Sequence, residues 1–122
     1  MSHTLPLQWA ASIEPEGNPA SVISVRSEEG QILVRGQLST GTRGWSLRGG
    51  AARKRSVITL QVTAVASDPI RAPDLEFHSY EAVITVRPAG RYRLRVTHAC
   101  FTKGESGESF IRPVHEQSIS VP

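Results

Sequence analysis

The chain has 122 residues and a formal net charge of +3, with 39% hydrophobic, 20% charged and 6% aromatic residues. These values fit one soluble domain that can bury a sizeable core, and a charge of +3 does not by itself indicate a nucleic-acid-binding protein. With 10 glycines and 8 prolines the chain is rich in turns, which favours many short strands over helices.

Cysteine content and apolar runs narrow the class of protein further. Cys100 is the only cysteine, so an intrachain disulfide is excluded and stability must come from packing. No apolar run approaches the roughly 20 residues of a membrane span. The N-terminus has no basic start and no long apolar segment, which makes a poor signal peptide. We therefore expect a cytoplasmic protein, unless a leader has been removed, and no membrane partner.

In the first half of the chain, apolar and polar residues alternate with a period of two, which predicts strands with one buried and one wet face. The first is an irregular edge strand that contains Pro6, and the fourth starts at Trp45 and ends in a basic segment rich in glycine and alanine. The predicted strands are 5–13, 21–26, 31–38 and 45–55. Loops at 14–20 and 39–44 lie between them.

In the second half, residues 56–66 form the longest clean strand, and 67–74, with two prolines, must connect two sheets. Residues 80–98 alternate on both sides of Pro88-Ala89-Gly90, which predicts two strands joined by a tight turn. A last strand at 110–121 is interrupted near Pro113. No segment has the sustained apolar period of a capped helix.

The segment around the Pro-Ala-Gly turn resembles the penultimate strand of immunoglobulin-like and fibronectin type III domains. In those domains a Gly-x-Tyr pattern follows a proline-rich corner, as Gly90-Arg91-Tyr92 does here. The resemblance implies that the Tyr92 hydroxyl bonds back to the backbone and that Trp45 is a core tryptophan. Replacing Tyr92 with Phe should then cost roughly 1–3 kcal/mol. It implies a fold and not a function.

These patterns together predict an all-β, immunoglobulin-like antiparallel β-sandwich of seven to eight strands, with one domain over residues 1–122. The inward-facing positions of the strands form the predicted core. Its members are Val34, Leu38, Trp45, Leu47, Ile58, Leu60, Val62, Tyr80, Ile84, Val86, Tyr92, Leu94, Val96 and Ile119.

The loop before Trp45 has a second resemblance, to chagasin-type inhibitors of papain-like cysteine proteases. These are small immunoglobulin-like domains without disulfides that insert three loops from one end into the protease cleft. Thr40-Gly41 and Trp45 are similar to their first-loop motif, although the Asn-Pro pair is missing and the other two loops depart from the pattern. The resemblance implies binding through Thr40, Gly41 and Arg43, with Lys103 on a second polar loop at 103–109.

Catalytic motifs are absent from the sequence, which has no P-loop, GxGxxG, HExxH or GxSxG pattern. His98 and Cys100 are two apart on one strand, so they face the same side and could supply two metal ligands or a thiolate with its base. His78 and His115 are further candidate ligands. The favoured interpretation is packing, because free cysteine is among the most buried residue types. We expect no cofactor and no enzymatic activity.

Arginines form the remaining pattern. Arg91, Arg93 and Arg95 share the wet face of one strand, and Arg35 would extend them into a basic stripe if it lay beside them. Such a stripe could hold a phosphate, a polyanion or an acidic partner, or it could simply be a solvated face. No aromatic residues alternate with the arginines, as single-strand nucleic-acid binders need.

The sequence favours a non-enzymatic binding or assembly module, and we expect its partner to be a protein. The alternative is a chagasin-like protease inhibitor that acts through loops at one end of the sandwich. The candidate binding residues are Thr40, Gly41, Arg43, Arg91, Arg93, Arg95 and Lys103.

Overall fold

The fold was obtained as a computed structural model, which describes residues 2–14, 23–40, 44–66, 76–102 and 110–122. These residues contain nine strands and no helix. The strands are β1 (His3–Thr4), β2 (Leu7–Glu14), β3 (Ser24–Glu28), β4 (Gln31–Thr40), β5 (Trp45–Lys54), β6 (Val57–Ala66), β7 (Glu76–Thr85), β8 (Gly90–Thr102) and β9 (Phe110–Val121).

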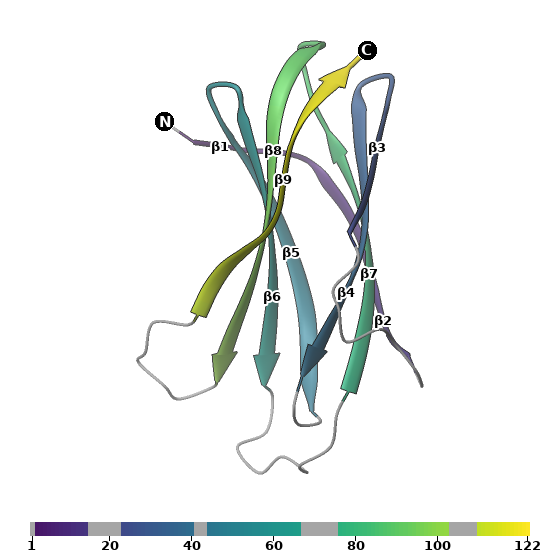
Figure 1. The fold of residues 1–122 in the computed structure, drawn as a ribbon, viewed down its shortest axis with the longest axis vertical. Helices are drawn as coiled ribbons and strands as arrows, with labels where there is room; N and C mark the ends of the chain where they lie inside the picture. The colour runs from purple at the N-terminus through teal and green to yellow at the C-terminus, as the bar shows by residue number, and fades with distance from the viewer. Residues whose placement is uncertain (1, 15–22, 41–43, 67–75, 103–109) are drawn as a thin grey trace.

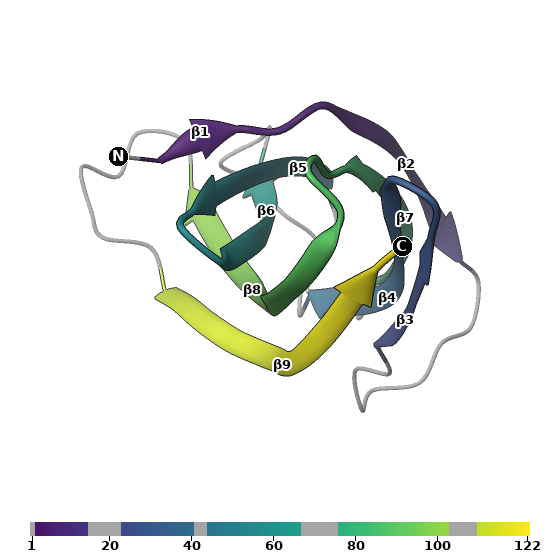
Figure 2. The same cartoon turned by 90° about the horizontal axis from the view of Figure 1, so that it is seen from above.

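The strands form two sheets that pack face to face (Figures 1 and 2), which confirms the predicted all-β sandwich. One sheet has five strands in the order β1-β5-β6-β8-β9, and the other has four in the order β2-β7-β4-β3. The nine strands exceed the expected seven to eight because the first predicted strand divides at Pro6. The amide of Leu5 donates to Ala51 in the five-stranded sheet, and the Pro6 carbonyl accepts from Thr85 in the other.

One strand pair departs from the predicted antiparallel pattern. β6 and β8 are parallel neighbours, with Ile58 aligned to Leu94. The chain leaves the five-stranded sheet after β6, runs back through β7 in the other sheet and returns as β8, so β6 and β8 point the same way. The connection at 67–75 does join two sheets, as its prolines predicted.

The predicted turn at Pro88-Ala89-Gly90 has a different role from a hairpin turn. β7 pairs with β2 and β4, whereas β8 pairs with β6 and β9, so the two strands it joins lie in different sheets. The Tyr92 hydroxyl donates to the carbonyl of Pro88 across this corner, so the bond implied for Tyr92 is present. The guanidinium of Arg53 lies 5.2 Å above the Tyr92 ring and donates to the Arg87 carbonyl at 2.7 Å. Tyr92 and Arg53 therefore hold the crossing between the sheets.

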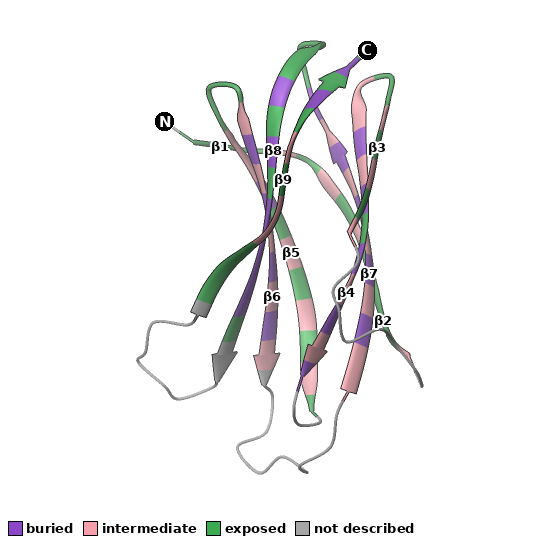
Figure 3. Cartoon of the chain, viewed as in Figure 1, coloured by how far each residue is buried: buried purple, intermediate pink, exposed green. Residues whose placement is uncertain are grey.

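Inward-facing residues of both sheets form one core, visible as the buried bands that alternate along the strands in Figure 3. The predicted core is correct except for Trp45 and Leu47, which are only half-buried. Trp45 begins β5 at one end of the sandwich, where less of the opposite sheet covers it. Trp9 takes the role expected of Trp45: it packs against the core and stacks on Tyr80 with ring centroids 5.3 Å apart. A Cβ at Gly49 would collide with the Trp9 ring, so this position of β5 must be glycine.

A buried hydrogen bond connects the two sheets inside this core. Tyr80 on β7 and His98 on β8 place the hydroxyl oxygen and Nε2 2.9 Å apart, and both residues are buried. Burial lowers the pKa of His98 to about 4, with the positive charge of Arg112 adding to the effect. The imidazole is therefore neutral near pH 7, and its Nε2 can accept a hydrogen bond from the Tyr80 hydroxyl.

Candidate functional site

Alternation along β8 turns three arginines to the outside of the five-stranded sheet. Arg91, Arg93 and Arg95 are exposed, whereas Tyr92 and Leu94 between them are buried. The three arginines therefore share one exposed face, as their spacing predicted.

The register of the sheet brings basic residues of β5 near these arginines. β6 lies between β5 and β8, so Lys54, Val57 and Arg93 form one row across the three strands. The next outward-facing row consists of Ala52, Thr59 and Arg95. Because neighbouring strands are about 4.8 Å apart, the backbones at Lys54 and Arg93 are about 10 Å apart.

Short side chains between the basic ones leave a hollow on this face. A depression of about 650 Å³ has Lys54, Arg55 and Arg95 at its rim, and a second of about 480 Å³ continues it to Arg48. Ala52 and Thr59 are cross-strand partners and line both depressions, so the two are continuous. We call this feature the basic trough. A rise of about 3.3 Å per residue makes it about 20 Å long from Arg48 to Lys54.

Negative charge on this face is limited to Glu116 of β9 within the described part of the chain. Its carboxylate lies 2.5 Å from Arg93 and 3.5 Å from Arg95. The hydrogen bond from Arg93, together with the nearby positive charges, lowers the pKa of Glu116 below its usual range. Among the described residues, one carboxylate thus shares this face with six basic side chains. These are Arg48, Lys54, Arg55, Arg91, Arg93 and Arg95.

Four of those six have no carboxylate within 4.0 Å among the residues that the structure describes. They are Arg48, Lys54, Arg55 and Arg91. The excess positive charge of this face is therefore open to an external anion.

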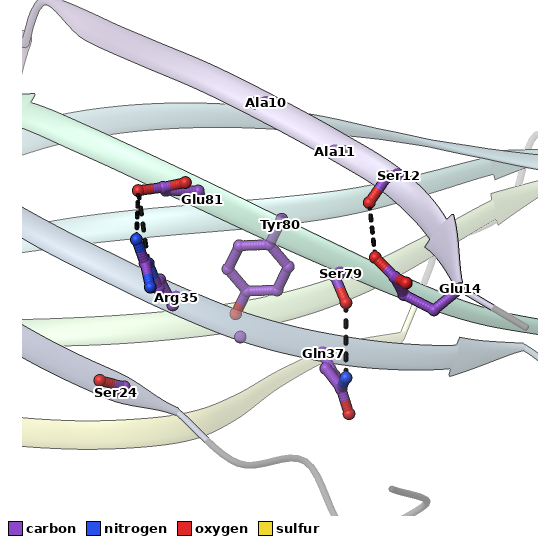
Figure 4. A pocket seen from close by; sticks show the side chains of 11 residues that line it. Ala10, Ala11, Ser12, Glu14, Ser24, Arg35, Gln37, Ser79, Tyr80 and Glu81 are labelled. Carbon is purple, nitrogen blue, oxygen red and sulfur yellow. Dashed lines mark hydrogen bonds and ion pairs between the residues drawn. The ribbon is translucent and has the colours of Figure 1, made fainter. Parts of the chain in front are cut away.

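Arg35 lies on the opposite face of the molecule and does not extend the stripe. Its guanidinium is 3.2 Å from Glu81, and both project from the outer side of the four-stranded sheet. A depression of about 570 Å³ lies beside this pair. Figure 4 shows side chains that line it, with Gln37 hydrogen-bonded to Ser79 and Ser12 hydrogen-bonded to Glu14. Of the charged groups drawn there, Arg35 and Glu81 pair with each other, and Glu14 accepts a hydrogen bond from Ser12. This depression is similar in size to each of the two depressions that make up the basic trough, but it carries no comparable excess charge.

The histidine–cysteine candidate does not gain a third ligand in the described structure. His98 is buried and bonded to Tyr80, while Cys100 is exposed, contrary to the burial expected for it. Desolvation raises the pKa of the Cys100 thiol, which disfavours the thiolate needed for nucleophilic attack or metal binding. No group of three or more His, Cys, Asp or Glu residues suited to a metal occurs among the described residues. His115 is 2.6 Å from the Gln117 side chain instead.

A buried polar pair in the same sandwich was not predicted from the sequence. His78 Nε2 and Glu76 Oε1 lie 2.9 Å apart, yet neither atom has a hydrogen bond of good geometry in the described structure. The two residues are two apart on β7 and share its inward face, so their spacing was the one signal that could have identified them.

The loop candidates are only partly described. Thr40 is the last residue of β4 and is 5% exposed, while Gly41, Arg43 and Lys103 lie outside the described residues. The described strand ends show that three connections leave the same end of the sandwich. They are β4 to β5, β6 to β7, and β8 to β9, at the lower end in Figure 1.

No helix long and apolar enough to cross a membrane is present in the described parts of the chain. We compared the chain with protein-family models, with curated proteins and with solved structures, and none of the three comparisons found a match. We therefore base the proposed function on the charges, contacts and register of this chain.

Proposed function

We propose that the chain is a non-enzymatic binding module that holds an acidic partner on the outer face of its five-stranded sheet. The observation that supports this function is the charge imbalance on this face, where six basic side chains and one carboxylate lie among the described residues. Long-range attraction to such a face speeds encounter with an acidic partner, and arginine adds directional hydrogen bonds to carboxylates.

The alternative explanation of the same residues is that they bind no ligand and form a solvated face that prevents sheet-edge aggregation. That role needs charge, but it does not need charge of one sign. The four-stranded sheet shows the other solution, in which Arg26 pairs with Glu28 and Arg35 with Glu81 at 3.2 Å each. The same chain thus pairs its charges on one face and leaves them unbalanced on the other.

Binding to fluorescent poly-glutamate at about 0.15 M salt tests the proposal. Reversing two charges at the basic trough, Lys54→Glu with Arg95→Glu, should lower the affinity at least about tenfold. The matched control reverses two charges on the opposite face, Arg26→Glu with Arg35→Glu, and has the same net charge. If both double variants lose affinity equally, or the parent chain does not bind at all, the proposal is wrong.

A protease inhibitor is the second candidate, because three strand connections leave one end of the sandwich, as the loops of chagasin-type inhibitors do. Its test is the residual activity of a papain-like enzyme with the chain at micromolar concentration. Full activity would exclude this candidate, and inhibition that survives the Lys54 and Arg95 reversals would place the function at the loop end.

A further inference from the structure

We infer that the acidic partner enters the basic trough as an extended acidic peptide segment whose carboxylates are two residues apart. This inference rests on the proposed function and specifies its partner. The trough follows β5 and β6, and its length of about 20 Å corresponds to about six residues of extended chain.

The spacing of the basic groups matches an extended peptide. Arg93 and Arg95 are two residues apart on β8, so their backbones are about 6.6 Å apart along the strand. Acidic side chains at alternate positions of an extended peptide have the same separation and point to the same side. Each arginine can then meet one peptide carboxylate in competition with Glu116, and the planar guanidinium can bind both oxygens of that carboxylate.

The floor of the trough allows a thin chain to approach. Gly50 and Ala52 on β5 have little or no side chain, and a Cβ added at Gly50 would meet no atom within 4 Å. On β6 the outward residues Thr59, Gln61 and Thr63 provide hydroxyl and amide groups that can bond a peptide backbone. Long basic side chains stand on both sides of this floor, at Lys54 on β5 and Arg95 on β8.

Nucleic acid fits these observations less well than a peptide. The described side chains that line the trough include no aromatic residue on which a base could stack. The lining is also narrow, since β5 and β8 are only about 10 Å apart.

The probe is a fluorescein-labelled peptide of about eight residues with glutamate and serine at alternate positions, which spans about 26 Å when extended. The comparison peptide has the same composition with its glutamates consecutive. Anisotropy titrations of the full chain should give roughly tenfold tighter binding to the alternating peptide, because only its carboxylates can all face the arginines.

Filling the floor provides a second test that leaves every charge in place. Ala52→Leu with Thr59→Leu should weaken the alternating peptide about tenfold, and Gly50→Val should act in the same direction. The matched control, Ala10→Leu with Ser24→Leu, fills the depression of Figure 4 and should change the affinity less than about twofold. Circular dichroism melts check that each variant is folded.

The outcomes separate this inference from the proposed function. If both peptides bind equally and floor filling has no effect, while Lys54→Glu with Arg95→Glu abolishes binding, the extended-peptide inference is wrong and the acidic partner stands. The extended-peptide inference is also wrong if an oligo-uridylate or a heparin fragment of equal charge binds more tightly than the alternating peptide. If no polyanion binds in a way that depends on Lys54 and Arg95, both are wrong.

Discussion

The two outer faces of the sandwich both have hollows, but charges are paired on one face and unbalanced on the other. The four-stranded sheet pairs Arg35 with Glu81 beside its depression, whereas the five-stranded sheet leaves Lys54 and Arg48 without a described carboxylate partner. Both hollows arise in the same way, from short outward side chains between long ones. A hollow in a β-sheet is therefore a weak sign of function, and the unbalanced charge is what distinguishes one face from the other.

The largest expected effect comes from a substitution in the core that supports both faces. Gly49 and Gly50 are neighbours on β5, but Gly49 faces Trp9 inside and Gly50 faces the basic trough outside. Gly49→Val should lower the free energy of unfolding by about 3 kcal/mol or more, because the new side chain must displace the Trp9 ring. Chemical denaturation measures the difference.

Gly50→Val is the matched control for this prediction. Nothing lies within 4 Å of the added Cβ, so stability should change by less than about 1 kcal/mol. Binding of the acidic peptide should nevertheless weaken in Gly50→Val, because the new side chain fills the floor of the basic trough. Equal destabilisation by both substitutions would show that Trp9 does not pack against Gly49 as described.

A second prediction concerns pH, which acts on the interior and not on the cations of the basic face. The folded pKa of His98 is about 4, below the value of about 6.5 expected in the unfolded chain. The unfolded chain therefore binds more protons between these values, so stability present above pH 6.5 is lost as the pH falls toward 4. The loss should reach up to about 3 kcal/mol.

Denaturant melts of the parent chain and of His98→Gln between pH 7 and pH 4 test this prediction. The Gln side chain can still accept a hydrogen bond from Tyr80, so the variant should fold and show a flatter pH dependence. If the two curves run parallel, a group other than His98 controls the acid sensitivity. All other titratable groups are the same in the two proteins, so their contributions cancel in the comparison.

The corner at Tyr92 gives a third, smaller effect. Its hydroxyl bonds the Pro88 carbonyl at the crossing from the four-stranded to the five-stranded sheet. Tyr92→Phe keeps the ring beneath Arg53 and removes only this bond, so it should cost roughly 1–3 kcal/mol in a denaturant melt. A cost near zero would mean that the corner bond contributes no stability and that the crossing is held by Arg53 and packing.

Alternation predicted the faces of the strands well but not their neighbours. A period of two shows that Leu94 is buried and Arg93 exposed, because that depends only on which side of the sheet each residue faces. It does not show whether β8 pairs with β6 or with β7. The Pro-Ala-Gly turn has the composition of a hairpin turn, and only the tertiary structure makes it a crossing.

The same limit explains which parts of the candidate site were predictable. The common face of Arg91, Arg93 and Arg95 follows from their spacing within one strand. Lys54 joins them only because β6 lies between β5 and β8, which is long-range information. Trp9, not Trp45, packs on Tyr80 for a similar reason. The chain passes from the five-stranded to the four-stranded sheet at Pro6, and the local sequence does not show which strand β2 pairs with.

The smallest expected effect concerns Glu116, and it tests the difference between the two faces most directly. Glu116 is the one described carboxylate on the basic face, and it occupies both Arg93 and Arg95. Glu116→Gln removes an internal competitor, so affinity for an acidic peptide should rise about threefold. Glu81→Gln makes the same change in net charge on the outer face of the other sheet. It should raise the affinity less, because packed sheets are about 10 Å apart and salt screens charges over about 8 Å at physiological ionic strength. An equal rise in affinity in both variants would mean that the peptide responds to the overall charge of the protein. The basic face would then not be the specific binding site of the acidic partner.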